Sequence, residues 1–179
     1  NLADGFEGEV AVVSRSLLVS GCAIGNPFAY LEVAVDDRRP SVQGPVRADR
    51  VVCEEAGAEL IEPVAILDAD FAEDVHDWDG EAAIRIARLR LGDKQASGLV
   101  GTLGFEGDGD LTRGDVTLAA RQAQLFGAEI GRATIDGRYA YRAKDNLLSL
   151  VGDVGAEGIV GGAALVDPTQ LEMMILNLV

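Results

Sequence analysis

Apolar and polar side chains alternate along most of this chain, most clearly between Asp115 and Tyr141. Successive side chains of a β-strand point to opposite faces of a sheet, so alternation predicts a strand with one apolar face. The stretch DVTLAARQAQLFGAEIGRATIDGRYAY therefore predicts two long strands joined by a turn at Phe126-Gly127. The apolar positions are Leu118, Ala120, Ala123 and Leu125 in the first strand, and Ala128, Ile130, Ala133 and Ile135 in the second.

The alternation slips by one residue in the middle of each of these strands, after Ala120 and after Ile130. Such a slip would turn all the following side chains to the other face unless a bulge or a bend restores them. The pattern therefore predicts long strands that contain a kink and keep one apolar face.

The same spacing, with apolar residues at relative positions 0, 2, 5 and 7, recurs along the chain. Strands that start every ten to twenty residues favour consecutive antiparallel strands, because a crossover helix needs a longer connection. The runs 10–13 and 17–19 predict a pair of strands, and 99–105 and 146–166 predict further strands. The recurring sets are Phe28, Tyr30, Val33 and Val35; Val46, Ala48, Val51 and Cys53; Val64, Ile66, Ala69 and Phe71; and Ile84, Ile86, Leu89 and Leu91.

The last residues follow a different pattern. Asp167 is a good helix N-cap and Pro168 suits the first helical position. One face at helical spacing then contains Leu171, Met174, Ile175 and Leu178. We therefore expect one domain, with a β-rich segment at 1–166 and an amphipathic helix at 167–179 that packs on the sheet or covers its open end.

Composition and charge reduce the number of functional classes that fit this chain. The 179 residues include 22 glycines and 5% aromatic residues, which suits many strands joined by tight turns. The net charge of −15 argues against nucleic acid as a partner and against docking on an anionic membrane surface. No apolar run approaches the roughly 18 residues that span a bilayer. Because the chain starts at Asn1, we expect a piece of a longer protein or a processed product.

The sequence carries no recognisable catalytic chemistry. It has no phosphate-binding loop, nucleophile elbow or metal-spaced Cys and His cluster, and His76 is the only histidine. The acidic run around His76 offers oxygen ligands for calcium, but its spacing does not fit a calcium-binding loop, so a solvated charge run is the default. We expect a protein that is not an enzyme, with no cofactor and no bound metal. Cys22 and Cys53 form a disulfide or remain two buried thiols, and the sequence leaves both open.

The strings VTLAARQAQLFGAEIGRATIDGRYAY and LLSLVGDVGAEGIVGG resemble the AsmA-like proteins of Gram-negative bacteria, of the TamB and YdbH types. The resemblance covers roughly residues 46–166. It implies a long, folded-over antiparallel sheet with an apolar groove, a periplasmic body, and an inner-membrane anchor in a region outside this chain. It further implies that phospholipid or another acyl-chain ligand travels in the groove towards the outer membrane, with membrane proteins as partners through the parent chain.

The apolar positions of the clearest strands are then the candidate groove residues. Small and branched side chains dominate these positions, which would leave room for acyl chains. The candidates are Ile84, Ile86, Leu89, Leu91, Leu118, Leu125, Ile130 and Ile135.

Two other interpretations stay open. The same apolar face would serve as the closed core of a β-sandwich or a β-solenoid, in an interaction or adhesion module of a secreted or surface protein. The last thirteen residues also resemble the nucleotide-binding helix of histidine kinases, with Asn177 at the magnesium-binding position. No phosphoacceptor helix precedes them, and a capped amphipathic helix explains the same residues.

Overall fold

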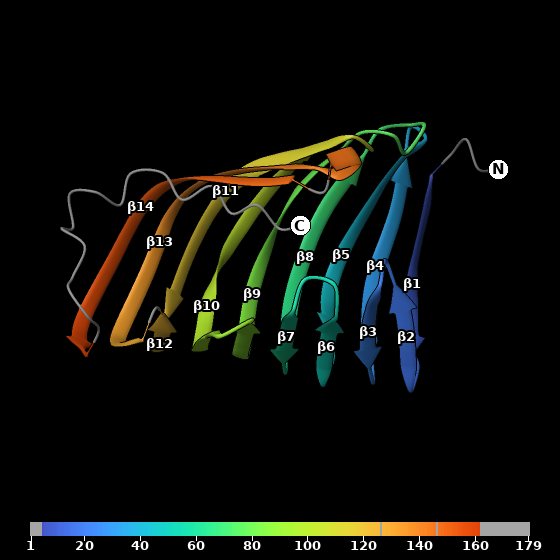
Figure 1. Ribbon diagram of the computed structural model, residues 1–179. Helices are drawn as coiled ribbons and strands as arrows, with labels where there is room; N and C mark the ends of the chain where they lie inside the picture. The colour runs from blue at the N-terminus through green and yellow to red at the C-terminus, as the bar shows by residue number, and fades with distance from the viewer. Residues whose placement is uncertain (1–4, 126, 146, 162–179) are drawn as a thin grey trace.

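One continuous antiparallel sheet contains every strand of the described residues. The structure is a computed structural model that describes residues 5–125, 127–145 and 147–161 (Figure 1). The strands are β1 (Phe6–Val13), β2 (Ser16–Val19), β3 (Cys22–Gly25), β4 (Phe28–Asp36), β5 (Arg39–Arg47), β6 (Arg50–Cys53), β7 (Ala58–Ile61), β8 (Val64–Phe71), β9 (Trp78–Leu91), β10 (Lys94–Gly107), β11 (Leu111–Ala120), β12 (Gln122–Leu125), β13 (Ala128–Arg142) and β14 (Leu147–Val160). A 3-10 turn, η2 (Ala143–Asp145), joins β13 and β14.

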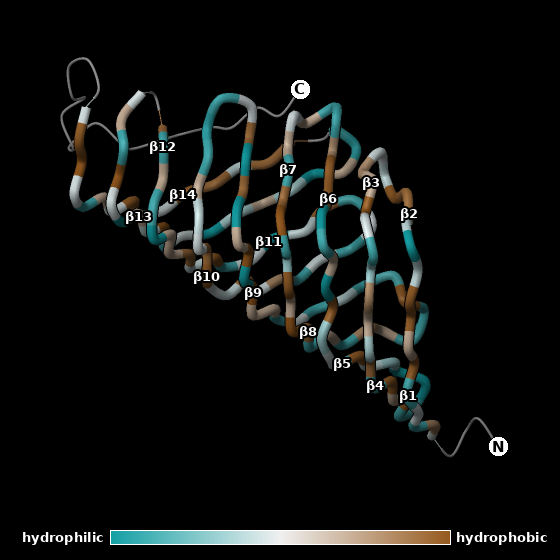
Figure 2. The backbone as a smooth tube through the Cα atoms, turned by 90° about the horizontal axis from the view of Figure 1, so that it is seen from below, coloured by the Kyte–Doolittle hydropathy of each residue, from teal (hydrophilic) through white to brown (hydrophobic). Residues whose placement is uncertain are grey.

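The sheet is folded over along a line that crosses every strand. Strand order along one side of this line is β1-β4-β5-β8-β9-β10-β11-β13-β14, and along the other side β2-β3-β6-β7-β9-β10-β12-β13-β14. The strands β9, β10, β13 and β14 run through both parts, whereas the others are divided in two at the line. We call the first part the long arm and the second the short arm; Figures 1 and 2 show the two arms as separate layers of strands.

The strand register does not change where the sheet bends. The fold line is one row of neighbouring positions on successive strands: Arg15, Asn26, Asp49, Glu62, Ala87, Gly98, Arg121, Arg132 and Glu157. Backbone hydrogen bonds continue across it, from Asn26 N to Arg15 O (2.9 Å) and from Glu62 N to Asp49 O (2.9 Å). The backbone amides at the bend therefore keep hydrogen-bond partners, which avoids the cost of unpaired backbone groups.

Two consecutive residues of each strand face outward at the fold line. In β9 these are the exposed Ala87 and Arg88, between the half-buried Ile86 and Leu89. The extra outward residue keeps the apolar residues of both arms on one face, and this confirms the kinks expected in β9, in β11–β12 and in β13. The bend uses a left-handed backbone at Asn26 (φ 48°) and Gly98 (φ 61°), residue types that tolerate it.

Three details of the expected strands are wrong. The runs 10–13 and 17–19 do not pair with each other, because β1 pairs with β4 and β2 pairs with β3. They are consecutive parts of one edge strand that bends at Ser14-Arg15. The kinks expected within 28–35 and within 64–71 are absent, because every second residue of β4 from Ala29 to Val35 and of β8 from Ala65 to Phe71 lies on the same face without interruption. Their bends lie earlier in the chain, at Asn26-Pro27 and Glu62-Pro63.

The observed fold also decides between the three architectures that the sequence allows: a folded-over sheet, a β-sandwich and a β-solenoid. A single antiparallel sheet that folds over is the elongated all-β architecture that we expected. It is neither the two sheets of a sandwich nor the coil of a solenoid. The expected helix at 167–179 lies outside the described residues. In the part of the chain that the structure describes, no helix is long and apolar enough to cross a membrane.

Candidate functional site

The face of the sheet that lies between the two arms is apolar, and we call it the inner face. In the long arm one register row joins every strand through apolar residues or glycine. This row is Val12, Ala29, Val46, Ala65, Ile84, Gly101, Leu118, Ile135 and Val154. Cross-strand neighbours on one face lie roughly 5 Å apart, so the row is a continuous apolar surface.

The short arm continues the inner face beyond the fold line. Its central row is Leu17, Ile24, Val51, Leu60, Leu89, Ala96, Ala123, Ile130 and Ile159. The row at the tip of the arm contains Cys22, Cys53, Ala58 and Leu91. Both arms therefore present an apolar surface to the space between them.

All the candidate groove residues lie on this inner face. Ile84, Leu118 and Ile135 share the long-arm row, and Ile86 lies one row closer to the fold line. Leu89 and Ile130 share the central short-arm row, and Leu91 and Leu125 lie at the tip of that arm. Each of these residues is half-buried. The structure thus brings the whole set together on one surface, although their sequence positions span two separate regions.

The described residues do not cover the inner face in the way that a closed core is covered. The buried apolar residues of the described chain are Ala69, Ala82, Leu99, Val116, Ala120 and Ala123, and all of them lie on the inner face. Most are small, and no described large side chain is fully buried. Exposure rises where the rows reach the sheet edges, to 45% at Val12 and 48% at Val154. In a closed sandwich, opposing apolar side chains would be removed from water on both sheets.

Gly101 shows why parts of this face carry no side chain. It lies between Ile84 and Leu118 in the long-arm row. A Cβ atom placed there would lie 2.0 Å from the carbonyl oxygen of Thr117 in the neighbouring strand. Only glycine therefore allows β10 and β11 to approach this closely, and it leaves a gap in the side chains of the inner face.

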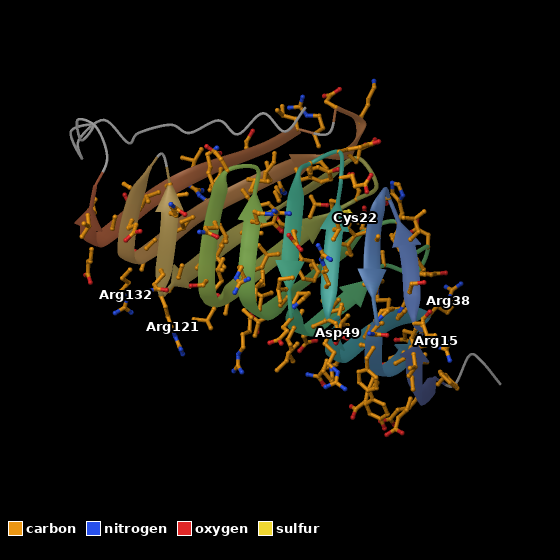
Figure 3. The ribbon with its side chains drawn as sticks, turned by 60° about the horizontal axis from the view of Figure 1, so that its bottom comes forward. Arg15, Cys22, Arg38, Asp49, Arg121 and Arg132 are labelled. Atoms are coloured by element: carbon orange, nitrogen blue, oxygen red, sulfur yellow. A yellow bond between two sulfur atoms is a disulfide. The ribbon has the colours of Figure 1, made fainter. Side chains whose placement is uncertain are left out.

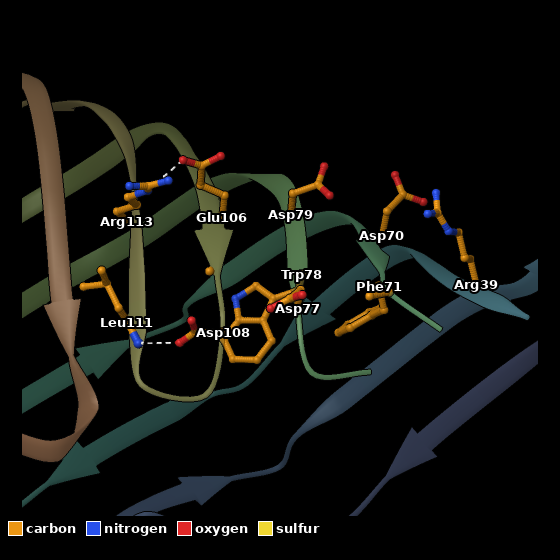
Figure 4. A pocket seen from close by; sticks show the side chains of 12 residues that line it. Arg39, Asp70, Phe71, Asp77, Trp78, Asp79, Glu106, Asp108, Leu111 and Arg113 are labelled. Atoms are coloured by element: carbon orange, nitrogen blue, oxygen red, sulfur yellow. Dashed lines mark hydrogen bonds and ion pairs between the residues drawn. The ribbon is translucent and has the colours of Figure 1, made fainter. Parts of the chain in front are cut away.

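Aromatic residues of the inner face gather at the far end of the long arm. Phe71 pairs directly with Trp78, and Trp78 with Gly107, on three adjacent strands. Phe105 and Tyr139 belong to the next row towards the fold line. A hollow of about 740 Å³ opens here, lined by Phe71, Trp78 and Leu111 together with charged residues (Figure 4). Burial raises the pKa of the Tyr139 hydroxyl above its usual value, so Tyr139 is neutral at physiological pH.

Charged residues of the outer face form the other side of this hollow. Arg113 Nε donates a hydrogen bond to Glu106 Oε1 (2.8 Å), and Asp108 Oδ1 accepts bonds from the backbone amides of Leu111 (2.9 Å) and Asp110 (2.8 Å). These amide bonds lower the pKa of Asp108 below its ordinary value. Among the described residues no group of three acidic, histidine or cysteine side chains is placed to hold a metal ion.

The short arm is held by cross-links between its strands. Cys22 and Cys53 are directly opposite each other on β3 and β6 and form a disulfide (Figure 3). On the outer face Glu59 forms ion pairs with Arg50 and with Arg90 (2.7 Å to Oε2 for Arg90). These links join the neighbouring strands β3, β6, β7 and β9, which have few backbone hydrogen bonds in this arm because their segments are short.

The aromatic end of the long arm did not emerge from the sequence pattern. Phe71 and Trp78 flank an acidic loop, and Phe105 and Tyr139 follow much later in the chain. Only the pairing of the strands brings these residues together. Phe71 and Trp78 share one row of the sheet, and Phe105 and Tyr139 share the next row on the same face. No family model, curated protein or solved structure matches this chain. Its function is therefore inferred from its own geometry.

Proposed function

We propose that this chain is a segment of a lipid-transfer protein that carries acyl chains on its inner face. The observation that carries the proposal is the pair of continuous apolar rows, one in each arm, whose large side chains stay partly exposed. An apolar surface of this extent is unfavourable in water and is characteristic of a binding site. An acyl chain that covers it gains about 0.8 kcal/mol for each buried methylene group.

The dimensions and shape of the inner face suit long, flexible ligands. With strands about 4.8 Å apart, the fold line from Arg15 to Glu157 is roughly 40 Å long. The rows contain alanine, valine, leucine and isoleucine with no polar side chain, so they offer no directional contact for a headgroup. Recognition is therefore of the hydrocarbon, and the headgroup of a bound lipid lies at the open side between the tips of the arms.

The disulfide supports a compartment outside the cytosol. Disulfides persist where thiols are oxidised, as in the periplasm, and are rare in the cytosol of most bacteria. The Cys22–Cys53 bond therefore agrees with the periplasmic body that the AsmA-like resemblance implies. We place the proposed transfer between the inner and outer membranes, with the inner-membrane anchor in a region not contained in this chain.

The test is lipid co-purification from a bacterial host, measured by native mass spectrometry and by lipid extraction. The wild-type chain should retain phospholipid through washing. Ile84→Asp and Ile130→Asp each introduce a charge on the inner face, one in each arm, and should reduce the lipid retained severalfold. Burial of a carboxylate beside hydrocarbon is costly, so the affected part of the face would stay hydrated.

Ile66→Asp is the matched control. Ile66 is an isoleucine of the same sheet that is 58% exposed on the outer face. Its replacement should leave the retained lipid unchanged. If the inner-face variants fold and still carry as much lipid as Ile66→Asp, acyl chains do not bind on the inner face and the proposal fails.

A further inference from the structure

Arginines gather on the outer side of the fold line, on the opposite face from the proposed lipid surface. Arg121 and Arg132 occupy neighbouring positions of the fold line, between the paired residues Ala120–Ala133 and Ala123–Ile130. Figure 3 shows both side chains pointing away from the space between the arms. Arg85 and Arg88 lie on β9, two strands from Arg121 and three from Arg132, and Arg88 pairs with Ser97. We call these four residues the arginine patch.

The side chain of Arg121 lies between the two halves of this patch. It lies across Gly98 of β10, the strand between β12 and β9, since a methyl group on Gly98 would lie 2.9 Å from Arg121 Cδ. The aliphatic part of this side chain therefore lies over β10, the strand that separates Arg121 from Arg85 and Arg88 on β9. The left-handed glycine at the bend makes room for this crossing.

No carboxylate of the described chain neutralises the patch. The four arginines are exposed, and none forms an ion pair or a side-chain hydrogen bond in the described residues. Glu62 and Glu157 border the patch on the fold line without pairing to it. In a chain of net charge −15, cations without partners on adjacent strands are unexpected, because like charges that face each other are destabilising.

A further group of outer-face acids lies in the long arm. The row that joins Glu9, Glu32, Asp68, Glu81 and Asp115 crosses the middle of the long arm, and it also contains Gln43 and Arg138. The fold line carries both signs, because Asp49, Glu62 and Glu157 share its row with Arg15, Arg121 and Arg132. The arginine patch is a local group of like charges that the net charge of the chain conceals.

A polar hollow adjoins the patch on the outer side of the short arm. Its volume is about 500 Å³. Arg88, Ser97, Gln122 and Gln124 line it and provide a guanidinium, a hydroxyl and two amides, whereas Glu129 is the one carboxylate among its lining residues. Gly131 and Gly158 leave it unfilled on the remaining side. Donors of this kind around a cationic group suit an oxyanion, which accepts several hydrogen bonds at once.

We propose that the arginine patch and this hollow bind a phosphate group. Arg88 lies at the hollow, and Arg121 and Arg132 directly precede or follow its lining residues Gln122 and Gly131. Guanidinium groups bind phosphate through paired N–H donors, and the bound anion offsets the repulsion between the arginines. The phosphate belongs to a free phosphate compound or to the headgroup of an anionic lipid, and these share the same chemistry. The site does not depend on the proposed lipid surface, because it lies on the other face.

The first experiment compares sodium phosphate with sodium chloride at equal ionic strength and measures binding by calorimetry and by the melting temperature. Phosphate should bind to the wild-type chain and raise its melting temperature. Arg132→Gln and Arg121→Gln should each raise the dissociation constant about fivefold to tenfold, the loss expected for one charge-assisted contact at an exposed site. Arg132→Lys should lose less, because it keeps the charge but not the paired donors.

Arg138→Gln is the matched control, since Arg138 lies on the same strand and the same face as Arg132 but away from the fold line, opposite Asp115. It should leave phosphate binding unchanged. Flotation with phosphatidylcholine vesicles, with and without phosphatidylglycerol, distinguishes the sources. Binding only to phosphatidylglycerol vesicles that is lost in Arg132→Gln assigns a lipid headgroup, and phosphate binding without flotation assigns a free phosphate compound.

Three results would overturn the proposal. The first is an equal response to chloride and phosphate with no binding to either kind of vesicle. The second is equal binding by Arg132→Gln and Arg138→Gln. The third is a dimer in sedimentation velocity at low salt that disappears in Arg132→Gln, because outer-face acids of a second copy would then occupy the patch. Circular dichroism checks that each variant is folded, and Arg88→Gln replaces any variant that is not.

Discussion

The two arms share one apolar face but are stabilised differently. The long arm has strand segments of about eight to ten residues, such as β5 and β11, and aromatic residues at its far end. The short arm has four-residue segments such as β3 and β6, joined by a disulfide and by the ion pairs of Glu59. A long segment gains enough from its own hydrogen bonds and packing, whereas a short one needs added links, as in small domains in general. The arms should therefore respond to different substitutions.

The largest expected effect is in the long arm, from Gly101→Ala. The added Cβ would lie 2.0 Å from the Thr117 carbonyl oxygen, so β10 and β11 must separate. We expect a loss of about 3–5 kcal/mol in the free energy of unfolding, measured in urea. Gly104→Ala is the control in the same strand, because its nearest contact is an ordinary 3.8 Å. Equal stability of the two variants would show that the approach of β10 to β11 is not constrained at Gly101.

The next effect belongs to the short arm, from replacement of both cysteines by serine. The disulfide closes a loop with a sequence separation of 31. Its removal should lower the free energy of unfolding by about 3–4 kcal/mol in the chain-entropy description. Hydrogen exchange should increase in β3 and β6 and much less in β4 and β5. Uniform loss of protection across both arms would mean that the arms unfold as one unit.

The ion pairs of Glu59 give a smaller effect in the same arm. The side chain of Glu59 is only 14% exposed and joins Arg50 to Arg90, both more than half exposed. Glu59→Gln should therefore cost about 1 kcal/mol after allowance for screening by solvent. Glu73→Gln removes the exposed pair with Arg38 and should cost less than about 0.5 kcal/mol, which chemical denaturation can compare directly. A larger loss of unfolding free energy in Glu73→Gln than in Glu59→Gln would contradict this expected order of the two ion-pair sites.

The smallest effect is the pH dependence from Asp108 in the long arm. Its pKa is lowered by the backbone amides of Leu111 and Asp110, so the folded protein binds this proton less readily than the unfolded chain. The stabilisation is present above the ordinary aspartate pKa of about 3.9 and is lost as the pH falls through the lower folded value. Asp108→Asn should make the stability less dependent on pH in that acidic range. An unchanged slope of stability against pH would show that the amide bonds do not persist in solution.

The sequence was informative where polar residues separate the apolar ones. In β9 the arginines between Ile84 and Leu91 leave only one apolar face, so both the strand and its kink could be predicted. In β4 and β8 both faces carry apolar residues, and Tyr30 and Ile66 lie on the outer face. Apolar spacing alone cannot decide which parity faces inward in such a strand. The register with neighbouring strands decides it.

The bends and the charged surfaces were beyond the reach of a local pattern. Ser14-Arg15-Ser16 separates two apolar runs in the way a hairpin turn would, yet the chain continues in the same direction into the other arm. Three polar residues fit either a hairpin turn, at which the chain reverses, or a bend within one strand. Only the identity of the neighbouring strands distinguishes these two cases. The arginine patch likewise depends on residues from β9 and from the β12–β13 region that meet through register.

Because the register is unbroken across the fold line, hairpins can be added to this sheet or removed from it without a change in the remaining strand pairs. Each pair of neighbouring strands meets with matched bends, so a hairpin such as β9–β10 is a complete unit with its own share of both arms. Duplication or removal of such a unit would lengthen or shorten the apolar surface in steps of about 10 Å while every other residue kept its face. The area of the apolar surface therefore scales with the number of hairpins in the sheet rather than with the chemistry of any one residue.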